Sequence, residues 1–298
     1  MRAMGYSVIT PVRNEAAHLT CLGRVMAAQR RLPERWVVVD TGSTDATLEV
    51  AEQLAAQNPW IAIERLPVGP VALRGGPVVR AFHFGLESVP ASSEVVVKLD
   101  ADTSFEDDYF DRLVRAFEED EALGIAGGSG YEQQSDGRWR QRHGTGFEVW
   151  GASRAYRRAC LEAILPLEER MGWDTMDLVA ATVRGWSTRA VPGLAFRHHR
   201  VEGERSPSRY QDYVSQGEAN HYMGYRPLYL LGKTLFRSVR DPLAVGIATG
   251  YVRSALRRSP RCGDLAVRAY IRDQQRLSHL HLRVGESLRP RGVLETQN

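Results

Sequence analysis

The chain has 298 residues, 43% of them hydrophobic and 25% charged, which excludes wholesale disorder and leaves room for one large domain with an appendage or for two domains. Three widely spaced cysteines argue against a disulfide framework and a zinc cluster, and they favour a reducing compartment. The net charge of +3 is uneven: residues 226–298 carry +9 and the remainder −6, which indicates a polyanionic partner for the C-terminal region.

The first half of the chain alternates strand and helix patterns. Short β-branched, apolar runs predict strands at 6–10, 36–40, 61–65 and 94–100, and helical spacing predicts helices at 15–30, 46–56, 78–88 and 107–119. This alternation predicts an α/β fold whose sheet is mostly parallel and covered by helices on both faces.

Polar clusters follow three of these strands. They read PVRNE from Pro11, DTGSTD from Asp40 and DADTSF from Asp100. Ligands of parallel sheets bind beyond the carboxyl ends of the strands, so we expect the three clusters to meet at one rim.

Asp100 and Asp102 close the strongest strand pattern. If the extended geometry persists, they share one face with Lys98, and two buried like charges need a positive partner. A pair of hard oxygen ligands at a strand end is typical of a Mg²⁺ or Mn²⁺ site that also holds a diphosphate. The alternative is an exposed turn whose aspartates cap the helix near Asp107.

The two earlier clusters also have two interpretations. Ser43, Thr44 or Asp45 can cap the following helix, whereas Asp40 lies too early to do so and could accept hydrogen bonds from a base or a ribose. Asn14 or Glu15 can start the first helix, or Arg13 and Glu15 can border a nucleotide.

The second region, about 124–200, mixes both patterns. It includes GFEVWG at 146–151, a helix-like segment at 153–165, a helix at 177–185 and a strand-like segment at 186–199. From Val201 onward the pattern is helical, aromatic and basic. We divide the chain into residues 1–205, with halves 1–123 and 124–205, and a helical region at 206–298.

In order and spacing, SVITPVRNE, VVVDTGSTDAT and VVVKLDADTSF resemble the nucleotide-binding half of family 2 glycosyltransferases with the GT-A fold, over about residues 6–200. The resemblance implies a nucleotide-sugar donor, Mg²⁺ or Mn²⁺, and an inverting mechanism. It assigns the base and ribose to Pro11, Glu15 and Asp40. Further candidate donor contacts are Arg13, Arg74, Arg80 and Lys98, together with the metal–diphosphate motif Asp100, Ala101 and Asp102.

An inverting transfer needs a carboxylate that takes the proton of the acceptor hydroxyl. Asp174 and Asp177 in MGWDTMDL share one face of a helical first turn, where the helix dipole keeps a carboxylate ionised. As helix-capping residues, both could serve stability alone. The common family pattern is a Glu-Asp pair, and this departure leaves the base open between the two, although we favour Asp174.

FRHHR, from Phe196 to Arg200, follows the last strand-like segment. Alternation directs only one of His198 and His199 into the site, where it could complete the metal shell; a surface pair is the alternative. By the resemblance, the acceptor pocket would be lined by aromatic and basic side chains that core packing explains equally well, namely Trp150, Tyr156, Arg157 and Trp173.

The segment from Arg226 to Arg261 mixes apolar clusters with arginines at helical spacing. It is either a solvated helical surface or an element that lies on anionic lipid, which would suit a lipid-linked acceptor. We expect no secretory signal because Pro11 interrupts the first apolar run, and no transmembrane helix because no apolar run approaches about 20 residues. Without a reading motif, a nucleic-acid partner is not expected.

These patterns together predict an inverting, metal-dependent glycosyltransferase of surface-polysaccharide or glycolipid assembly, peripheral at the cytoplasmic face of the membrane. One alternative is a sugar-phosphate nucleotidyltransferase, although PVRNEAAHL lacks the Gly-rich phosphate loop of such enzymes. Another is a non-catalytic scaffold that binds nucleotide sugar at the membrane. A dehydrogenase is disfavoured because no G-x-G-x-x-G follows the first strand.

Overall fold

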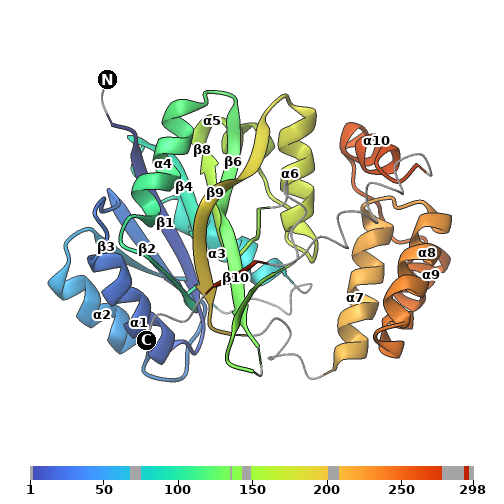
Figure 1. Ribbon diagram of the computed structural model, residues 1–298, viewed down its shortest axis with the longest axis horizontal. Coiled ribbons are helices and arrows are strands. Elements are labelled where there is room, and N and C mark those ends of the chain that lie inside the picture. Colours follow the sequence, from blue (N-terminus) through green and yellow to red (C-terminus); the bar gives the residue numbers. More distant parts are fainter. Residues whose placement is uncertain are drawn as a thin grey trace.

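The computed structural model describes residues 3–67, 75–134, 136–142, 149–200, 208–276 and 292–294. Figure 1 shows its ten-stranded sheet between helices, with the C-terminal helices beyond α6. The elements are, in chain order, β1 (Gly5–Val12), α1 (Ala16–Ala27), β2 (Arg35–Asp40), α2 (Thr47–Gln57), β3 (Ile61–Arg65), α3 (Gly76–Leu86), β4 (Ser93–Leu99), β5 (Thr103–Phe105), α4 (Tyr109–Glu119), β6 (Leu123–Gln133), β7 (Trp139–Gln141), β8 (Ser153–Arg157), α5 (Arg158–Ile164), α6 (Trp173–Val183), β9 (Ser187–His198), α7 (Arg209–Tyr222), α8 (Pro227–Ser238), η1 (Pro242–Val245), α9 (Gly246–Leu256), α10 (Leu265–Asp273) and β10 (Val293–Leu294).

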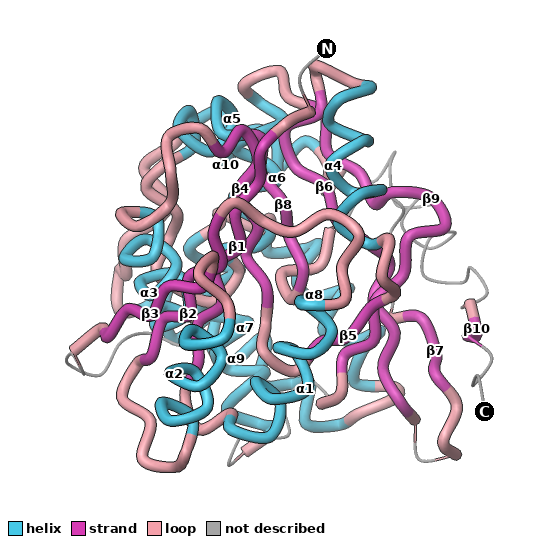
Figure 2. Tube along the Cα trace, turned by 90° about the vertical axis from the view of Figure 1, so that its left-hand side faces the viewer, coloured by secondary structure: helices cyan, strands magenta, loops and turns pink. Residues whose placement is uncertain are grey.

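The sheet follows the order β10-β7-β6-β8-β4-β1-β2-β3, and β9 pairs with β5 and β6. Strands β4, β1, β2 and β3 are parallel, whereas β8 runs antiparallel to both β4 and β6. Figure 2 shows β3 and β7 near opposite ends of the sheet. The α/β fold with a mostly parallel sheet is confirmed.

Apolar side chains cover both faces of the parallel strands. Successive residues alternate between the faces, so Val8 packs with α1, α2 and α4, and Ile9 packs with α3, α5 and α6. Val37 and Val38 divide in the same way. Burial on both faces explains the continuous apolar runs of β1, β2 and β4, whereas the edge strand β3 is only half-buried and has a weaker pattern.

The loops after β1 and β2 interlock at one rim. Strand β1 pairs with β2 up to Val12 and Asp40, so the loops that follow the two strands begin side by side. Oδ1 of Asn14 accepts a hydrogen bond from the backbone N–H of Thr44 at 2.7 Å, and Oγ1 of Thr47 accepts one from the N–H of Glu15 at 2.7 Å. The side chains of Asn14 and Thr47 therefore serve loop structure.

One predicted helix is partly wrong. Residues 153–165 divide into β8 and helix α5, and only the second part is helical. Strand β8 fills the gap between β4 and β6, with Leu99 opposite Ser153 and Val95 opposite Arg157. Backbone pairing on both sides overrides the local helical pattern of SRAYR.

The C-terminal helices form a layer next to α6. Met176 of α6 shares an apolar cluster with Ala219 and Met223 of the α7 region and with Val267 and Ile271 of α10. Helices α7 and α9 pack against each other, with Gly217 of α7 in close contact with Ile247 of α9. Among the described residues, none of the helices combines the length and apolar character needed to cross a bilayer.

Candidate active site

The turn between β4 and β5 carries Asp100 and Asp102. The backbone N–H of Asp100 donates to the carbonyl of Ala152 at 2.8 Å, and Oγ1 of Thr103 donates to the carbonyl of Asp100 at 2.8 Å. Strand β5 then pairs with β9, placing Thr103 opposite His198. The N–H of His199 also donates to the carbonyl of Asp102 at 2.8 Å. Two segments about a hundred residues apart in sequence meet here.

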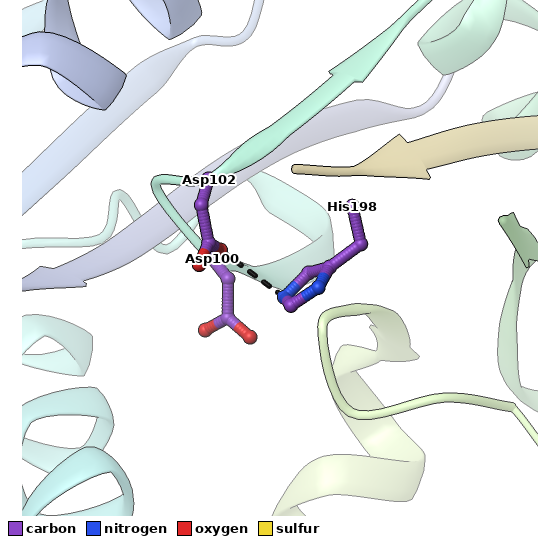
Figure 3. Close-up of side chains that lie close together, drawn as sticks. All are labelled: Asp100, Asp102 and His198. Atoms are coloured by element: carbon purple, nitrogen blue, oxygen red, sulfur yellow. Dashed lines mark ion pairs between the residues drawn. The ribbon is translucent and has the colours of Figure 1, made fainter. Parts of the chain in front are cut away.

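Asp100, Asp102 and His198 each offer a ligand atom, and these atoms lie within 4.8 Å of one another (Figure 3). Nε2 of His198 is 3.2 Å from Oδ1 of Asp102. Two carboxylates and one imidazole form a donor set that suits Mn²⁺, and Mg²⁺ less well because Mg²⁺ prefers oxygen. The residues present thus fit a divalent cation.

Only one histidine of FRHHR faces this cluster, as alternation predicts. His199 is exposed, with Nε2 2.7 Å from Oγ of Ser104 and its ring edge-on to Trp139. Its inclusion among the candidate metal ligands is therefore corrected: the backbone of His199 supports the Asp102 turn, and its side chain lies outside the group of possible ligands.

Two cationic side chains, Lys98 and Arg200, compensate the two aspartates. Lys98 is buried and donates to Oδ1 of Asp100 at 2.5 Å and to the carbonyl of Gly151 at 2.7 Å. Arg200 lies 3.1 Å from Oδ2 of Asp102. The positive partners that the sequence required are Lys98 and Arg200, and His198 is a further close partner of Asp102.

The pKa values of the cluster reflect this arrangement. Burial raises the pKa of Asp100, against the opposing charge of Lys98. Burial also acts on Asp102, but the hydrogen bond from His198 and the charges of His198 and Arg200 outweigh it and lower the pKa of Asp102 to about 2. Asp102 is therefore the carboxylate held firmly in its ionised form.

Arg200 is a site residue that the sequence analysis left without a role. Its guanidinium donates to Oε1 and Oε2 of Glu15 at 2.9 and 2.8 Å while it also contacts Asp102. His18, one turn into α1, is 2.9 Å from Oε2 of Glu15. One arginine thus joins the PVRNE and DADTSF clusters. The period-2 spacing of His198 and Arg200 would have indicated a shared face.

The other expected nucleoside contacts lie along the same rim. Asp40 is buried at the end of β2, and its carboxylate accepts hydrogen bonds from the N–H groups of Gly42 and Ser43 at 3.2 Å. Pro11 is half-buried near the end of β1, and Arg13 is exposed in the following loop. The structure therefore brings Asp40 and Glu15 to one edge, with Asp40 also shaping its own turn.

Helix α3 begins close to the loop before α6. Gly75 has a φ of 83°, and a Cβ there would lie 2.9 Å from the backbone of Arg170 and Met171, so only glycine fits. Arg80 is half-buried in the second turn of α3, and its Nε has no hydrogen-bond partner among the described residues. Arg74 lies outside the described residues.

Asp177 is buried in the core, which excludes it as a candidate base. Its side chain is 1% exposed, forms an ion pair with Arg154 of β8 and accepts a hydrogen bond from the hydroxyl of Tyr156 at 2.6 Å. Burial raises the pKa of Asp177, although Arg154 opposes this effect. An acceptor hydroxyl has no access to a carboxylate enclosed in this way, which corrects the expectation for Asp177.

Asp174 lies at the edge of the site instead. It is half-buried in the first turn of α6. A Cβ on Gly151 would lie 3.5 Å from Cβ of Asp174 and 3.1 Å from the ring of Trp173, so glycine permits this close approach. The carbonyl of the same Gly151 accepts the hydrogen bond from Lys98, which links the α6 terminus to Asp100.

The four candidate acceptor contacts separate into two pairs. The ring of Trp150 stacks on Phe196, with ring centroids 5.5 Å apart, and its centroid lies 4.6 Å from that of the His198 ring. The ring centroid of Trp173 lies 5.6 Å from Nζ of Lys98. Both tryptophans therefore border the cluster, and Trp150 also fixes the His198 ring.

Tyr156 and Arg157 are corrected, because neither lies at the rim. Tyr156 has no exposed surface, and its hydroxyl is committed to Asp177. Arg157 pairs in register with Val95, at the opposite end of β4 from Asp100, and donates to the carbonyls of Phe117, Asp120 and Leu123. Their side chains stabilise the sheet and the neighbouring loop.

Several solved structures resemble this fold. Residues 1–349 of TarS from S. aureus, in complex with UDP-GlcNAc, are 19% identical, with 73% of this chain and 66% of that chain covered and a TM-score of 0.55. The mannosyltransferase PcManGT from Pyrobaculum calidifontis, in complex with GDP-Man and Mn²⁺, is 14% identical, with 96% and 85% covered and a TM-score of 0.55. At these low sequence identities, the structural similarity shows a shared GT-A fold and nothing further.

Sequence comparison gives the family. The succinoglycan biosynthesis protein ExoA of Rhizobium meliloti (strain 1021) is 32% identical over 108 residues, which cover 36% of this chain and 31% of ExoA. The chain thus matches less than a third of the length of this curated relative. The family model described as "Glycosyl transferase family 2" matches residues 7–171, which is more than half of the chain and includes most of β1 and all of β2, β3 and β4. The chain belongs to glycosyl transferase family 2.

Proposed function

We propose that the protein transfers a sugar, with inversion, from a UDP- or GDP-sugar to a glycan or lipid-linked acceptor in cell-surface polysaccharide or glycolipid assembly. The observation that carries the proposal is the meeting of Asp100, Asp102 and His198 at the rim where β1, β2 and β4 end. Family membership and the named ligands of TarS and PcManGT support a nucleotide-sugar donor.

Asp100, Asp102 and His198 would hold the divalent cation, with Mn²⁺ favoured over Mg²⁺ by the imidazole nitrogen. When bound, such an ion neutralises the negative charge that develops on the leaving diphosphate. PcManGT was solved with Mn²⁺, which supports the choice of metal.

The donor would lie along the rim between the loops after β1 and β2 and the β4–β5 turn. Asp40 retains acceptor lone pairs beyond its contacts in the turn, and it would bind the base or ribose together with the Pro11–Glu15 loop. The unpaired Nε of Arg80 would donate to the diphosphate, because a buried guanidinium nitrogen without a partner is costly unless a ligand satisfies it.

Asp174 would act as the base. It would take the proton of the acceptor hydroxyl while that oxygen forms a bond to the anomeric carbon and the bond from this carbon to the diphosphate oxygen breaks, releasing nucleoside diphosphate. Trp150 and Trp173 would line the acceptor side, since aromatic faces suit sugar rings. Lys98 would hold Asp100 and the Gly151 backbone in register with the start of α6.

The test begins with a panel of UDP- and GDP-sugars, each with and without Mn²⁺. A donor should raise the melting temperature most when Mn²⁺ is present, because ligands bound by the native state stabilise it. With that donor and an extract of lipid-linked glycans, nucleoside diphosphate should be released. Pyrophosphate release from a nucleoside triphosphate would instead indicate a nucleotidyltransferase, and binding without turnover would indicate a scaffold.

Asp174→Asn should then lower kcat by about 10²–10⁴-fold while leaving the donor-induced thermal shift intact, because only the proton acceptor is lost. Asp273→Asn, at the end of α10, is the matched control and should keep full activity, since its side chain is 45% exposed and pairs with Arg276. Unchanged transfer by Asp174→Asn would place the base on another residue.

A further inference from the structure

Helix α8 is apolar on a face that no described residue covers. Leu228 is 80% and Val239 is 86% exposed, and Leu231 and Leu235 between them are also exposed. Their spacing of three, four and four residues places all of them on one side of the helix. The other side already packs into the protein through Leu230. We name these four exposed side chains the α8 stripe.

The same pattern continues in the next two elements. Leu243 and Val245 are exposed in η1, and Val252 and Leu256 are exposed on α9 at spacings of seven and eleven residues from Val245. We name Val245, Val252 and Leu256 the α9 stripe. Ile247 and Tyr251 of α9 face the opposite way and pack with Leu230. Two neighbouring helices therefore each bury one apolar face and expose a second.

Arginines accompany both stripes. Residues 226–276 contain eleven Lys and Arg against three Asp and Glu, a net charge of +8. Arg253, Arg257 and Arg258 are exposed and form no ion pair with a carboxylate in the described ranges. Asp241 and Asp264, by contrast, pair with Arg209 and Arg184. The exposed surface of this layer is therefore both apolar and strongly positive.

This layer is fastened to the helix that carries Asp174. Met176 of α6 packs with Ala219 and Met223, and Arg184, directly after α6, pairs with Asp264 at 3.0 Å. A partner that binds the stripes consequently has a fixed position and orientation relative to the N-terminus of α6. An acceptor that is embedded in the bound partner would approach the candidate base from a defined direction.

We infer that the α8 and α9 stripes and their arginines dock the protein onto the surface of an anionic lipid bilayer. Leucine and valine side chains would enter the headgroup boundary, and the arginines would pair with lipid phosphates. A second copy of this chain suits the surface less well, because a twofold contact sets the same patch against itself and would oppose one +8 surface with another. The inference adds a partner to the proposed function, and its test does not use the transfer reaction.

The experiment measures co-sedimentation of the whole purified chain with vesicles of phosphatidylcholine alone or of equal parts phosphatidylcholine and phosphatidylglycerol. Binding should require phosphatidylglycerol and weaken at high salt. Arg253→Gln/Arg257→Gln/Arg258→Gln should reduce partitioning by about a hundredfold, since each arginine near an anionic surface contributes about fivefold. Leu231→Glu/Leu235→Glu should reduce it by at least as much.

Matched controls make the same changes on the GT-A domain. Leu32→Glu replaces an exposed leucine of the α1–β2 loop, and Arg24→Gln/Arg65→Gln/Arg138→Gln removes three exposed arginines. Both controls should bind vesicles like the wild type. The inference is overturned if the wild type ignores phosphatidylglycerol vesicles or if the stripe and control variants bind alike. It is also overturned if light scattering shows a dimer that Leu231→Glu/Leu235→Glu converts to monomer.

Discussion

Two charged clusters of this protein contain the same chemistry in opposite settings. At the rim, Asp102 contacts Arg200 and His198, and Arg200 also binds Glu15. In the core between β8 and α6, Asp177 contacts Arg154 and Tyr156. Each cluster joins an aspartate to an arginine from a distant segment, so neither the residue types nor the pairing distinguishes a site from a structural ion pair.

Access and the direction of the pKa shifts separate the two. The groups around Asp102, whose side chain is 8% exposed, lower its pKa to about 2, and the adjoining Asp100, whose pKa burial raises, is 30% exposed and gives a ligand access to the cluster. Asp177 and Arg154 are both 1% exposed, and burial raises the pKa of Asp177. A closed pair of this kind fixes geometry, whereas an open one can exchange partners.

The buried cluster of Asp177, Arg154 and Tyr156 nevertheless supports the cluster at the rim. We call the first the sealed cluster and the second, which contains Asp102, the open cluster. Arg154 donates to the backbone carbonyl of Asp174 at 2.6 Å as well as to the carboxylate of Asp177. The same guanidinium lies 5.3 Å from the ring centroid of Trp173. The first turn of α6 is thereby held against β8, which positions the Asp174 side chain near the rim.

The largest expected effect comes from the open cluster. Asp102→Asn should reduce the proposed metal-dependent transfer by about 10³-fold or more, because a divalent ion held at this site would contribute several kcal/mol of charge stabilisation in the transition state. Addition of EDTA should have the same effect on the wild type, reversed by Mn²⁺. Release of nucleoside diphosphate is the readout, and exposed Asp136→Asn is the control. Full Mn²⁺-dependent activity in Asp102→Asn would show that the open cluster does not hold the metal ion and is no more functional than the sealed one.

A substitution in the sealed cluster should change the stability of the protein. Asp177→Asn should lower the free energy of unfolding by about 3–5 kcal/mol, because Arg154 is left as an uncompensated buried charge. Urea unfolding measures this change, and Arg154→Met/Asp177→Leu should recover most of it. The half-buried Asp174→Asn is the control and should change stability by about 0.5 kcal/mol or less. An Asp177→Asn protein as stable as the wild type but inactive would contradict the structural assignment.

The smallest effect concerns the link within the open cluster. Arg200→Lys keeps the charge but cannot bridge Glu15 and Asp102, so the Mn²⁺ concentration for half-maximal activity should rise by about 10–100-fold. The matched control is Arg197→Lys near the end of β9, three residues before Arg200, where the arginine pairs with Glu106 at the surface. An equal Mn²⁺ dependence in both variants would show that Arg200 does not support the metal site.

Much of the donor half was predictable from the sequence. The strands at 36–40 and 61–65 match β2 and β3 to within a residue, and the polar clusters after β1, β2 and β4 do share one rim. The reason is local: apolar runs buried on two faces are continuous, and parallel strands bring their carboxyl ends to one edge.

The acceptor half was less predictable because its contacts are long-range. The segment SRAYR carries a helical pattern, yet it is a strand because β4 and β6 pair with it on both sides. The choice between Asp174 and Asp177 depended on Arg154, which lies 20 and 23 residues before them in the chain. Neither spacing nor helix position contains that information.

The sequence by itself determined the parallel sheet, the Asp100–Asp102 pair and the need for positive charge beside it, because each follows from the period of a strand and from the cost of burying like charges. Only the tertiary structure selected His198 over His199 and supplied Arg200, and it enclosed Asp177 while leaving Asp174 near the rim. The physical reason is that burial and charge pairing depend on which distant segments meet, and β9 and β8 reach these residues through the sheet.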